Sequence, residues 1–292
     1  MEGRFRTAWA KGSSTRELAE ALGSGVAVSL GKDWLNTCIA ERVDLIVTGR
    51  MPSFEAVSIA MPIDVELDNL SSITAAIGGG PHSELAAHVT AALADAWLVP
   101  ASLVTVCRND AEKSEVQDRV RQLAADSGVD SVEILEAGSA GAILDTLDES
   151  SLLVVGAPGG SWLQRQFFGP GHRLAVKAPG GALVVRHAPP RAFHAVAQSS
   201  LVFGPQMNAS EAKRLADAPV VPVAEDGRLV GIVRIAALAD HPPEAEVQVA
   251  MEPPVSIDAT EPAEAADDLR DFLDGGPVPV VASDGRLIGS IL

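Results

Sequence analysis

Between Ser72 and Pro189, short apolar runs alternate with longer segments of helical periodicity. ITAAIGG, ASLVTVCR and SLLVVGAPGG are typical of buried strands, whereas DAEKSEVQDRVRQLAADSG predicts an exposed amphipathic helix that stops at Gly128. Strands and helices that alternate in this way form a parallel sheet covered by helices on both faces. Ligands bind such a sheet where its strand order reverses, which we expect between the loops after Ile77 and Val155.

The third of these runs continues into a glycine-rich loop, GAPGGSWLQRQFFGPGHR, which precedes another helical segment. Glycines there let main-chain N–H groups approach a phosphate, and the N-terminus of the following helix adds a favourable partial charge. After the first strand, GGGPHS forms a second short glycine loop, in which we expect Ser83 to cap the next helix. The candidate anion-binding residues of the two loops are Gly78, Gly79, Gly80, Gly156, Gly159, Gly160, Gly169, His172 and Arg173.

GGGPHSELAAHV together with the spaced glycines of the longer loop resembles the universal stress protein family. The resemblance covers residues 71–190 and implies a flavodoxin-like α/β domain that forms homodimers and binds ATP in the crevice. Two positions depart from the family pattern. Gly78 stands where ATP-binding members carry an aspartate, and Pro170 stands where they carry a serine or threonine hydroxyl. The longer loop is therefore either a retained anion site or a glycine loop kept for its geometry.

Residues 1–70 repeat the alternation in a shorter form. DLIVTGR parallels SLLVVGA, and AVSIAMPIDVEL parallels AVKAPGGALVV. We interpret this segment as a shortened, degenerate relative of the central domain that imitates the family dimer inside one chain; a small α/β appendage with a chance likeness is the alternative. Its nucleotide loop is reduced to GRMPSF, which leaves nothing to cradle phosphate. GVAVSLGKD is not a P-loop, because its glycines are wrongly spaced and Asp33 replaces the magnesium-binding hydroxyl.

The motif Asp-Gly-Arg-Leu-(Val/Ile)-Gly occurs twice, beginning at Asp226 and Asp284, each time after an apolar run. Asp-Gly supplies the positive φ angles of a tight turn, so each copy predicts a hairpin. A strand and a helix are expected before each hairpin. One such unit leaves sheet surface uncovered, whereas two together build one core.

Strand, helix and hairpin twice over residues 200–292 are similar to a pair of cystathionine-β-synthase (CBS) domains. The resemblance implies an α+β pair whose clefts bind AMP, ATP or S-adenosylmethionine and relay occupancy to an attached domain. At the phosphate position of the family motif this chain has Arg234, the last candidate binding residue. Ala237 replaces the carboxylate that holds ribose, so the nucleotide chemistry of the cleft is reduced.

The charge balance limits the partners. A net charge of −17 argues against nucleic acid and anionic membranes. No apolar window approaches the roughly 18 residues of a membrane span, so direct membrane insertion is not expected. The first residues lack the apolar core of a secretion signal, and Cys38 and Cys107 have no CxxC context; we interpret both as reduced thiols of a cytoplasmic protein.

No catalytic or metal-binding constellation is found in the sequence. The six histidines lack partners at zinc-ligand spacing, and there is no GxSxG elbow. We therefore predict a non-enzymatic cytoplasmic regulatory or stress-response protein that senses ATP, ADP or AMP through the glycine-rich loop or the CBS cleft. The alternative is a dimerisation or docking scaffold with degenerate sites, which partners a membrane transporter or a signalling protein.

Overall fold

The computed structural model describes residues 5–10, 12–23, 28–50, 56–157, 170–197 and 199–292. The chain divides into two compact units. The first contains Met1–Trp34 and Val43–Ala188, and the second contains Leu35–Arg42 and Pro189–Leu292. Within the described part, no helix is long and apolar enough to span a membrane.

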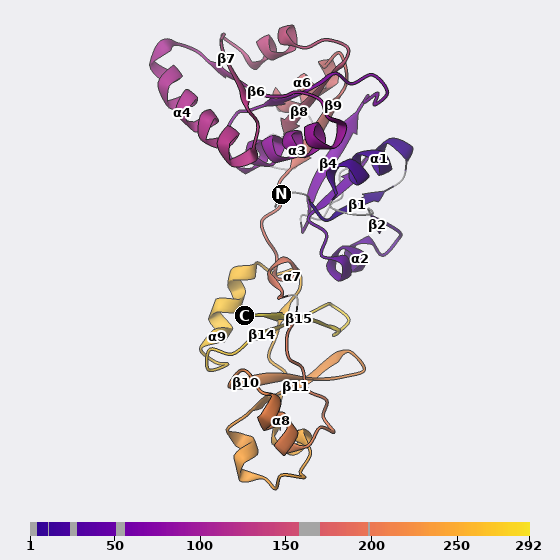
Figure 1. Cartoon of the computed structure of the whole chain (residues 1–292), viewed down its shortest axis with the longest axis vertical. Helices are drawn as coiled ribbons and strands as arrows, with labels where there is room; N and C mark the ends of the chain where they lie inside the picture. Colours follow the sequence, from indigo (N-terminus) through magenta and orange to yellow (C-terminus); the bar gives the residue numbers. More distant parts are fainter. Residues whose placement is uncertain (1–4, 11, 24–27, 51–55, 158–169, 198) are drawn as a thin grey trace. The chain divides into compact units, whose positions relative to one another are not determined.

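A nine-stranded sheet forms the centre of the first unit (Figure 1). Its strands are β1 (Thr7–Ala10), β2 (Val28–Ser29), β3 (Leu45–Thr48), β4 (Ser58–Ile63), β5 (Ser72–Ala76), β6 (Ala101–Cys107), β7 (Ser131–Glu136), β8 (Ser151–Gly156) and β9 (Ala182–Arg186). Their spatial order is β2-β1-β3-β4-β9-β8-β5-β6-β7. All neighbours run parallel except β4 and β9, which are antiparallel. Two parallel halves therefore meet at one antiparallel seam.

The two halves share a strand order. In the central half, β5 to β9 are the first to fifth strands along the chain, and their spatial order is 3-2-1-4-5. In the N-terminal half, β1 and β2 correspond to the first and second strands, and β3 and β4 to the fourth and fifth. The N-terminal half therefore has the same order without a third strand. The mostly parallel sheet confirms the expected α/β class, while flavodoxin itself has the strand order 2-1-3-4-5. Local sequence patterns specify strands but not the order in which they join, so the flavodoxin-like fold of the central half stays a prediction.

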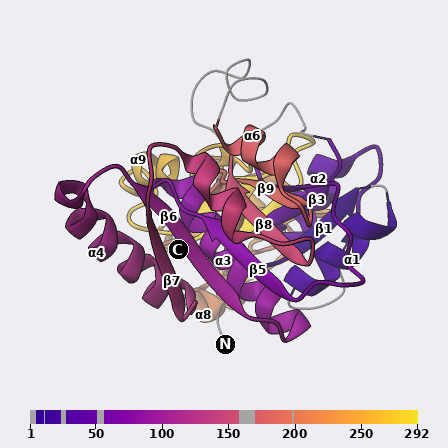
Figure 2. The same cartoon turned by 90° about the horizontal axis from the view of Figure 1, so that it is seen from above.

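Helices cover both faces of this sheet, as the alternation predicted (Figure 2). Among the described residues before Pro189, the helices are α1 (Ser13–Leu22), α2 (Trp34–Glu41), α3 (Pro81–Trp97), α4 (Asp110–Ser127), η1 (Ala140–Thr146) and α6 (Pro170–Lys177), where η denotes a 3-10 helix. From residue 35 onward, α2 belongs to the second unit. Leu152 and Val154 of β8 join the core under α1, α3 and α4, whereas Leu153 and Val155 join the core under η1 and α6.

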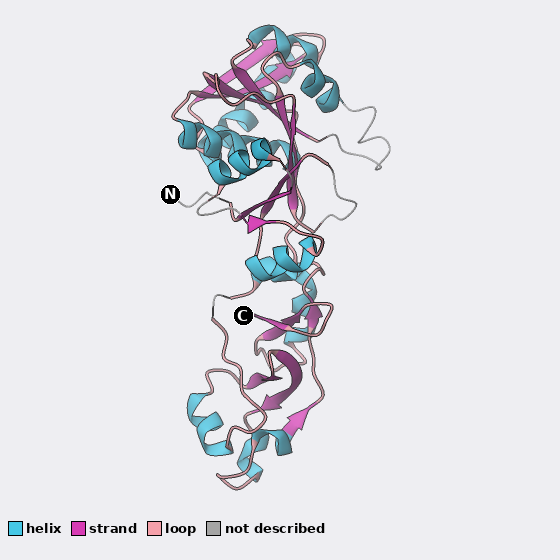
Figure 3. Ribbon diagram, turned by 90° about the vertical axis from the view of Figure 1, so that its right-hand side faces the viewer, coloured by secondary structure: helices cyan, strands magenta, loops and turns pink. Residues whose placement is uncertain are grey.

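The second unit contains two three-stranded sheets, β10-β11-β12 and β13-β14-β15 (Figure 3). From Pro189 onward, the helices and strands in chain order are α7 (Ala192–Ala195), α8 (Ala209–Leu215), β10 (Val220–Glu225), β11 (Arg228–Arg234), η2 (Ala237–Asp240), η3 (Val247–Ala250), β12 (Met251–Glu252), β13 (Ile257–Asp258), η4 (Ala263–Ala266), α9 (Asp267–Arg270), β14 (Val278–Val281) and β15 (Leu287–Ile291). Both predicted hairpins are present, β10–β11 and β14–β15.

The two hairpin turns differ in detail. Asp226 and Gly227 both have positive φ angles, 49° and 75°, as a two-residue turn requires. In the second copy, positive φ is confined to Gly285 of the Asp-Gly pair, and the main-chain N–H of Ala282 closes a longer loop on the carbonyl of Arg286. An antiparallel bridge between Arg228 and Arg286 joins the two hairpins.

Candidate functional site

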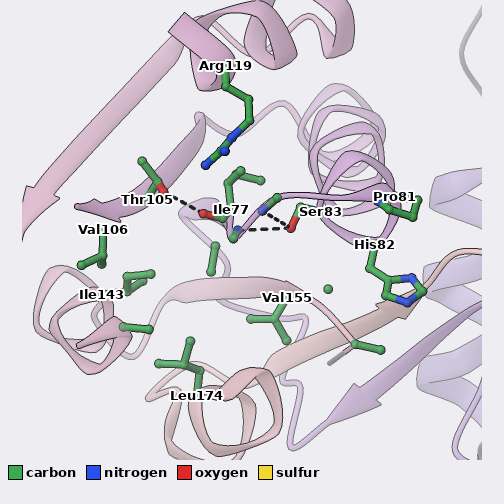
Figure 4. A pocket seen from close by; sticks show the side chains of 16 residues that line it. Ile77, Pro81, His82, Ser83, Thr105, Val106, Arg119, Ile143, Val155 and Leu174 are labelled. Carbon is green, nitrogen blue, oxygen red and sulfur yellow. Dashed lines mark hydrogen bonds between the residues drawn. The ribbon is translucent and has the colours of Figure 1, made fainter. Parts of the chain in front are cut away.

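A cavity of about 520 Å³ lies in the first unit, at the carboxyl ends of β5, β6 and β8. Strand order reverses between β5 and β8, so the cavity confirms the predicted crevice between the residues after Ile77 and those after Val155. Its wall mixes apolar and polar groups, and the side chains of Val106, Ile143 and Leu174 face it (Figure 4). A parallel sheet thus places a pocket where a ligand is expected.

The loop after β5 is closed by hydrogen bonds within the protein. The main-chain N–H groups of Gly78 and Gly79 both donate to Ser83 Oγ at 3.1 Å (Figure 4). Helix α3 begins after Gly80, so Ser83 lies inside its first turn and is not the N-cap that the sequence suggested. Thr105 Oγ1 donates to the carbonyl oxygen of Ile77 at 2.7 Å. Ser83, rather than a ligand, therefore satisfies the two glycine amides.

Gly156 has a packing role that needs no ligand. A Cβ atom added there would lie 2.9 Å from the carbonyl carbon of His82 and 3.0 Å from its Cβ. His82 in turn accepts a hydrogen bond at Nδ1 from the main-chain N–H of His187, at 3.0 Å. The end of β8 can therefore approach the first turn of α3 only because residue 156 has no side chain.

Arg119 brings a positive charge to the cavity from α4. Its Cζ lies 3.8 Å from the position that a Cβ of Gly79 would occupy, and the side chain points toward Thr105 and Ile77 (Figure 4). Arg119 is not among the residues predicted from sequence, because an arginine on a highly charged helix gives no sign of which face it occupies. The available signal was indirect: α4 follows β6, whose end borders the crevice.

The structure places the predicted site residues of the first unit in four ways. Gly78, Gly79 and Gly156 line the cavity, whereas Gly80 is the N-cap of α3. Arg173 lies exposed on α6, next to a residue of the cavity wall. Gly159, Gly160, Gly169 and the side chain of His172 lie outside the described residues. The longer glycine loop therefore stays a prediction.

Arg234 belongs to the second unit and is held by groups of that unit. Its Nε donates to Glu252 at 3.0 Å, its Nη2 donates to the carbonyl oxygen of Phe272 at 2.9 Å, and its Nη1 donates to the carboxylate of Asp274. The guanidinium also lies 5.6 Å from the centre of the Phe272 ring. Two carboxylates thus balance its charge, and a phosphate would have to compete with them.

No group of three or more His, Cys, Asp or Glu residues in the described ranges is arranged to hold a metal ion. No protein-family model and no curated protein sequence matches the chain. Solved structures that resemble part of it contain CBS domain pairs. The cytosolic domain of the Mg²⁺ channel MgtE in complex with ATP is 23% identical over 35% of this chain and 45% of its own, with a TM-score of 0.31.

A CBS domain pair/ACT domain protein from Thermotoga maritima is 19% identical over 35% of this chain and 88% of its own, with a TM-score of 0.32. CBSX2, a CBS-pair protein from Arabidopsis thaliana, in complex with AMP is 24% identical over 33% of this chain and 83% of its own, with a TM-score of 0.29. The chain thus spans less than half the length of the MgtE structure.

Proposed function

We propose that this protein is a non-enzymatic regulatory protein that binds an adenine nucleotide in the cavity at the ends of β5, β6 and β8. The observation that carries this proposal is the position of the cavity where strand order reverses, with Arg119 at its edge. Its volume of about 520 Å³ lies within the range of small-molecule sites.

The lining suggests how such a nucleotide is held. Ile143, Val155 and Leu174 offer an apolar surface for the adenine ring, and Arg119 offers a guanidinium for the phosphates. Because Ser83 already occupies the amides of Gly78 and Gly79, Arg119 takes the anion-binding role that the sequence analysis gave to those glycines. With no carboxylate at position 78 for the adenosine moiety, we expect weak affinity.

We further propose that residues 71–190 are a universal stress protein-like domain, with the N-terminal half as its degenerate second copy. The antiparallel seam and the shared strand order support this internal dimer. DLIVTGR and SLLVVGA, which parallel each other in sequence, form β3 and β8, and each of these strands pairs with the first strand of its half. The repeated hairpins of residues 200–292 likewise support a CBS-type pair.

Calorimetric titration of the full chain with ATP, ADP, AMP and S-adenosylmethionine tests the proposal. We expect heat with at least one adenine nucleotide and a loss of affinity of at least about tenfold in Arg119→Glu, because the charge at the cavity edge is reversed. Arg121→Glu is the matched control: it makes the same change on α4 at a residue outside the cavity lining. An unresponsive wild type at millimolar ligand would overturn the proposal.

A docking scaffold with degenerate sites, serving a transporter or a signalling protein, is the second candidate. The internal pairing of the Gly78 and Gly79 amides and of Arg234 favours it, because these groups need no ligand. A wild type that binds none of the four ligands yet sediments as a homodimer would support the scaffold. A monomer that binds ATP would exclude it.

A further inference from the structure

A second cavity, of about 720 Å³, lies in the N-terminal half of the sheet at the carboxyl ends of β1, β2 and β3. Its lining includes Lys32, Thr48, Gly49 and Arg50. From the sequence, nothing in residues 1–70 was expected to hold a phosphate. The structure instead places two cationic residues around a cavity in that segment.

Strand register makes this cavity the counterpart of the central one. Ala10 of β1 pairs with Thr48 of β3, as Ala76 of β5 pairs with Val155 of β8. All four residues line their respective cavities. Both cavities therefore occupy the same position in their halves, where the strand order reverses.

The chemistry of the two cavities differs at equivalent positions. Two residues after Thr48 the N-terminal half has Arg50, and two residues after Val155 the central half has Ala157. On the other side of β1 and β5 lie β2 and β6. By the register of these pairs, Lys32, which follows β2, corresponds to Val106 of β6. Two apolar residues of the central cavity are thus replaced by cations in the N-terminal one.

Local contacts hold Arg50 at this edge. Thr48, which is 8% exposed, donates from Oγ1 to the carbonyl oxygen of Arg50 at 3.1 Å and accepts from its main-chain N–H at 3.3 Å. The side chains of Lys32 and Arg50 are exposed, and no carboxylate among the described residues forms an ion pair with either. In a chain of net charge −17, two cations that pair with no described carboxylate beside one cavity create a local site for an anion.

We propose that the cavity at the ends of β1, β2 and β3 binds a small phosphate-bearing anion between Lys32 and Arg50. Arginine presents a planar fork of N–H donors and lysine a point charge, a combination suited to phosphate oxygens. Side-chain cations here replace the main-chain amides of a glycine-rich loop. The proposal concerns a different cavity from the nucleotide site and stands whether or not ATP binds there.

Titration with inorganic pyrophosphate at low ionic strength tests this site. The Arg119→Glu variant of the full chain is the starting protein, so that the central cavity does not contribute. We expect binding in this background and a loss of at least about tenfold in affinity when Lys32→Ala and Arg50→Ala are added, because two charge-assisted hydrogen bonds disappear. Arg214→Ala, which removes one exposed cation from α8 of the second unit, should leave the affinity unchanged.

Circular dichroism checks that each variant is folded, and Arg50→Lys, which keeps the charge, should retain most of the affinity. Absence of pyrophosphate binding in the Arg119→Glu background at millimolar concentration overturns the proposal, as does equal binding with and without Lys32 and Arg50. Neither result bears on ATP binding by the wild type, so failure here and failure of the nucleotide site are distinguishable.

Discussion

The main-chain N–H of Leu287 donates to the carbonyl oxygen of Gly227 at 2.9 Å, and the N–H of Leu229 donates to that of Gly285 at 3.3 Å. Leu287 and Gly285 each lie 58 residues beyond Leu229 and Gly227, so the two bonds exchange under an approximate two-fold axis. The two copies of Asp-Gly-Arg-Leu therefore bind each other. This reciprocal pairing gives the sequence repeat a structural reason.

Replacing Gly227 with alanine should destabilise the second unit. Gly227 has φ of 75°, and an added Cβ would meet no atom within 4 Å, so the cost is backbone strain rather than a clash. We expect the free energy of unfolding to fall by about 1 kcal/mol in urea titrations. Gly204→Ala, also in open space but without positive φ, is the control and should change little. Equal effects of the two substitutions would contradict this account.

Gly156→Ala should destabilise the first unit, because the new Cβ would lie 2.9 Å from the main chain of His82. We expect a loss of about 1–3 kcal/mol, the usual cost of overpacking, measured by chemical unfolding. Gly49, its equivalent in the N-terminal half, has no atom within 4 Å of an added Cβ, and Gly49→Ala should be tolerated. A Gly156→Ala protein as stable as wild type would show that the close approach of α3 and β8 is wrong.

Leu98→Gly should stabilise the first unit. Leu98 ends α3 in the left-handed conformation, at φ of 57°, and is 91% exposed, so its side chain contributes little packing. Glycine removes the strain at this position, and we expect the unfolding midpoint to rise by an amount equivalent to about 1 kcal/mol. Leu98→Ala keeps the Cβ and should have little effect. A stabilised alanine variant would argue instead for the loss of exposed apolar surface.

Cys38 should make stability fall at alkaline pH. Burial raises the pKa of its thiol from 9.0 to about 12, because the thiolate is poorly solvated inside the protein. Between these values the unfolded chain loses a proton that the folded chain keeps, so the free energy of unfolding decreases as pH rises. Wild type should therefore lose more stability than Cys38→Ala from pH 9 upward, and parallel curves in urea would exclude this assignment.

Local patterns predicted much of the fold. Apolar runs such as that before Gly78 became strands, Asp-Gly marked both hairpins, and the crevice between the ends of β5 and β8 is present. Properties that depend on distant residues were not predictable. The strand order, the hydrogen bonds from two glycine amides to Ser83 and the approach of Arg119 to the cavity all depend on how separate elements pack.

The antiparallel seam bears on how the protein is made. Ile59 of β4 pairs with Arg186 of β9, and Ile63 pairs with Ala182, so each contact joins residues more than 100 positions apart. During translation the first 70 residues leave the ribosome long before their partner strand exists. Until β9 is made, the edge of β4 that pairs with it therefore has unpaired main-chain groups, which can pair with another chain. Premature termination before Ala182 would release a chain prone to aggregation.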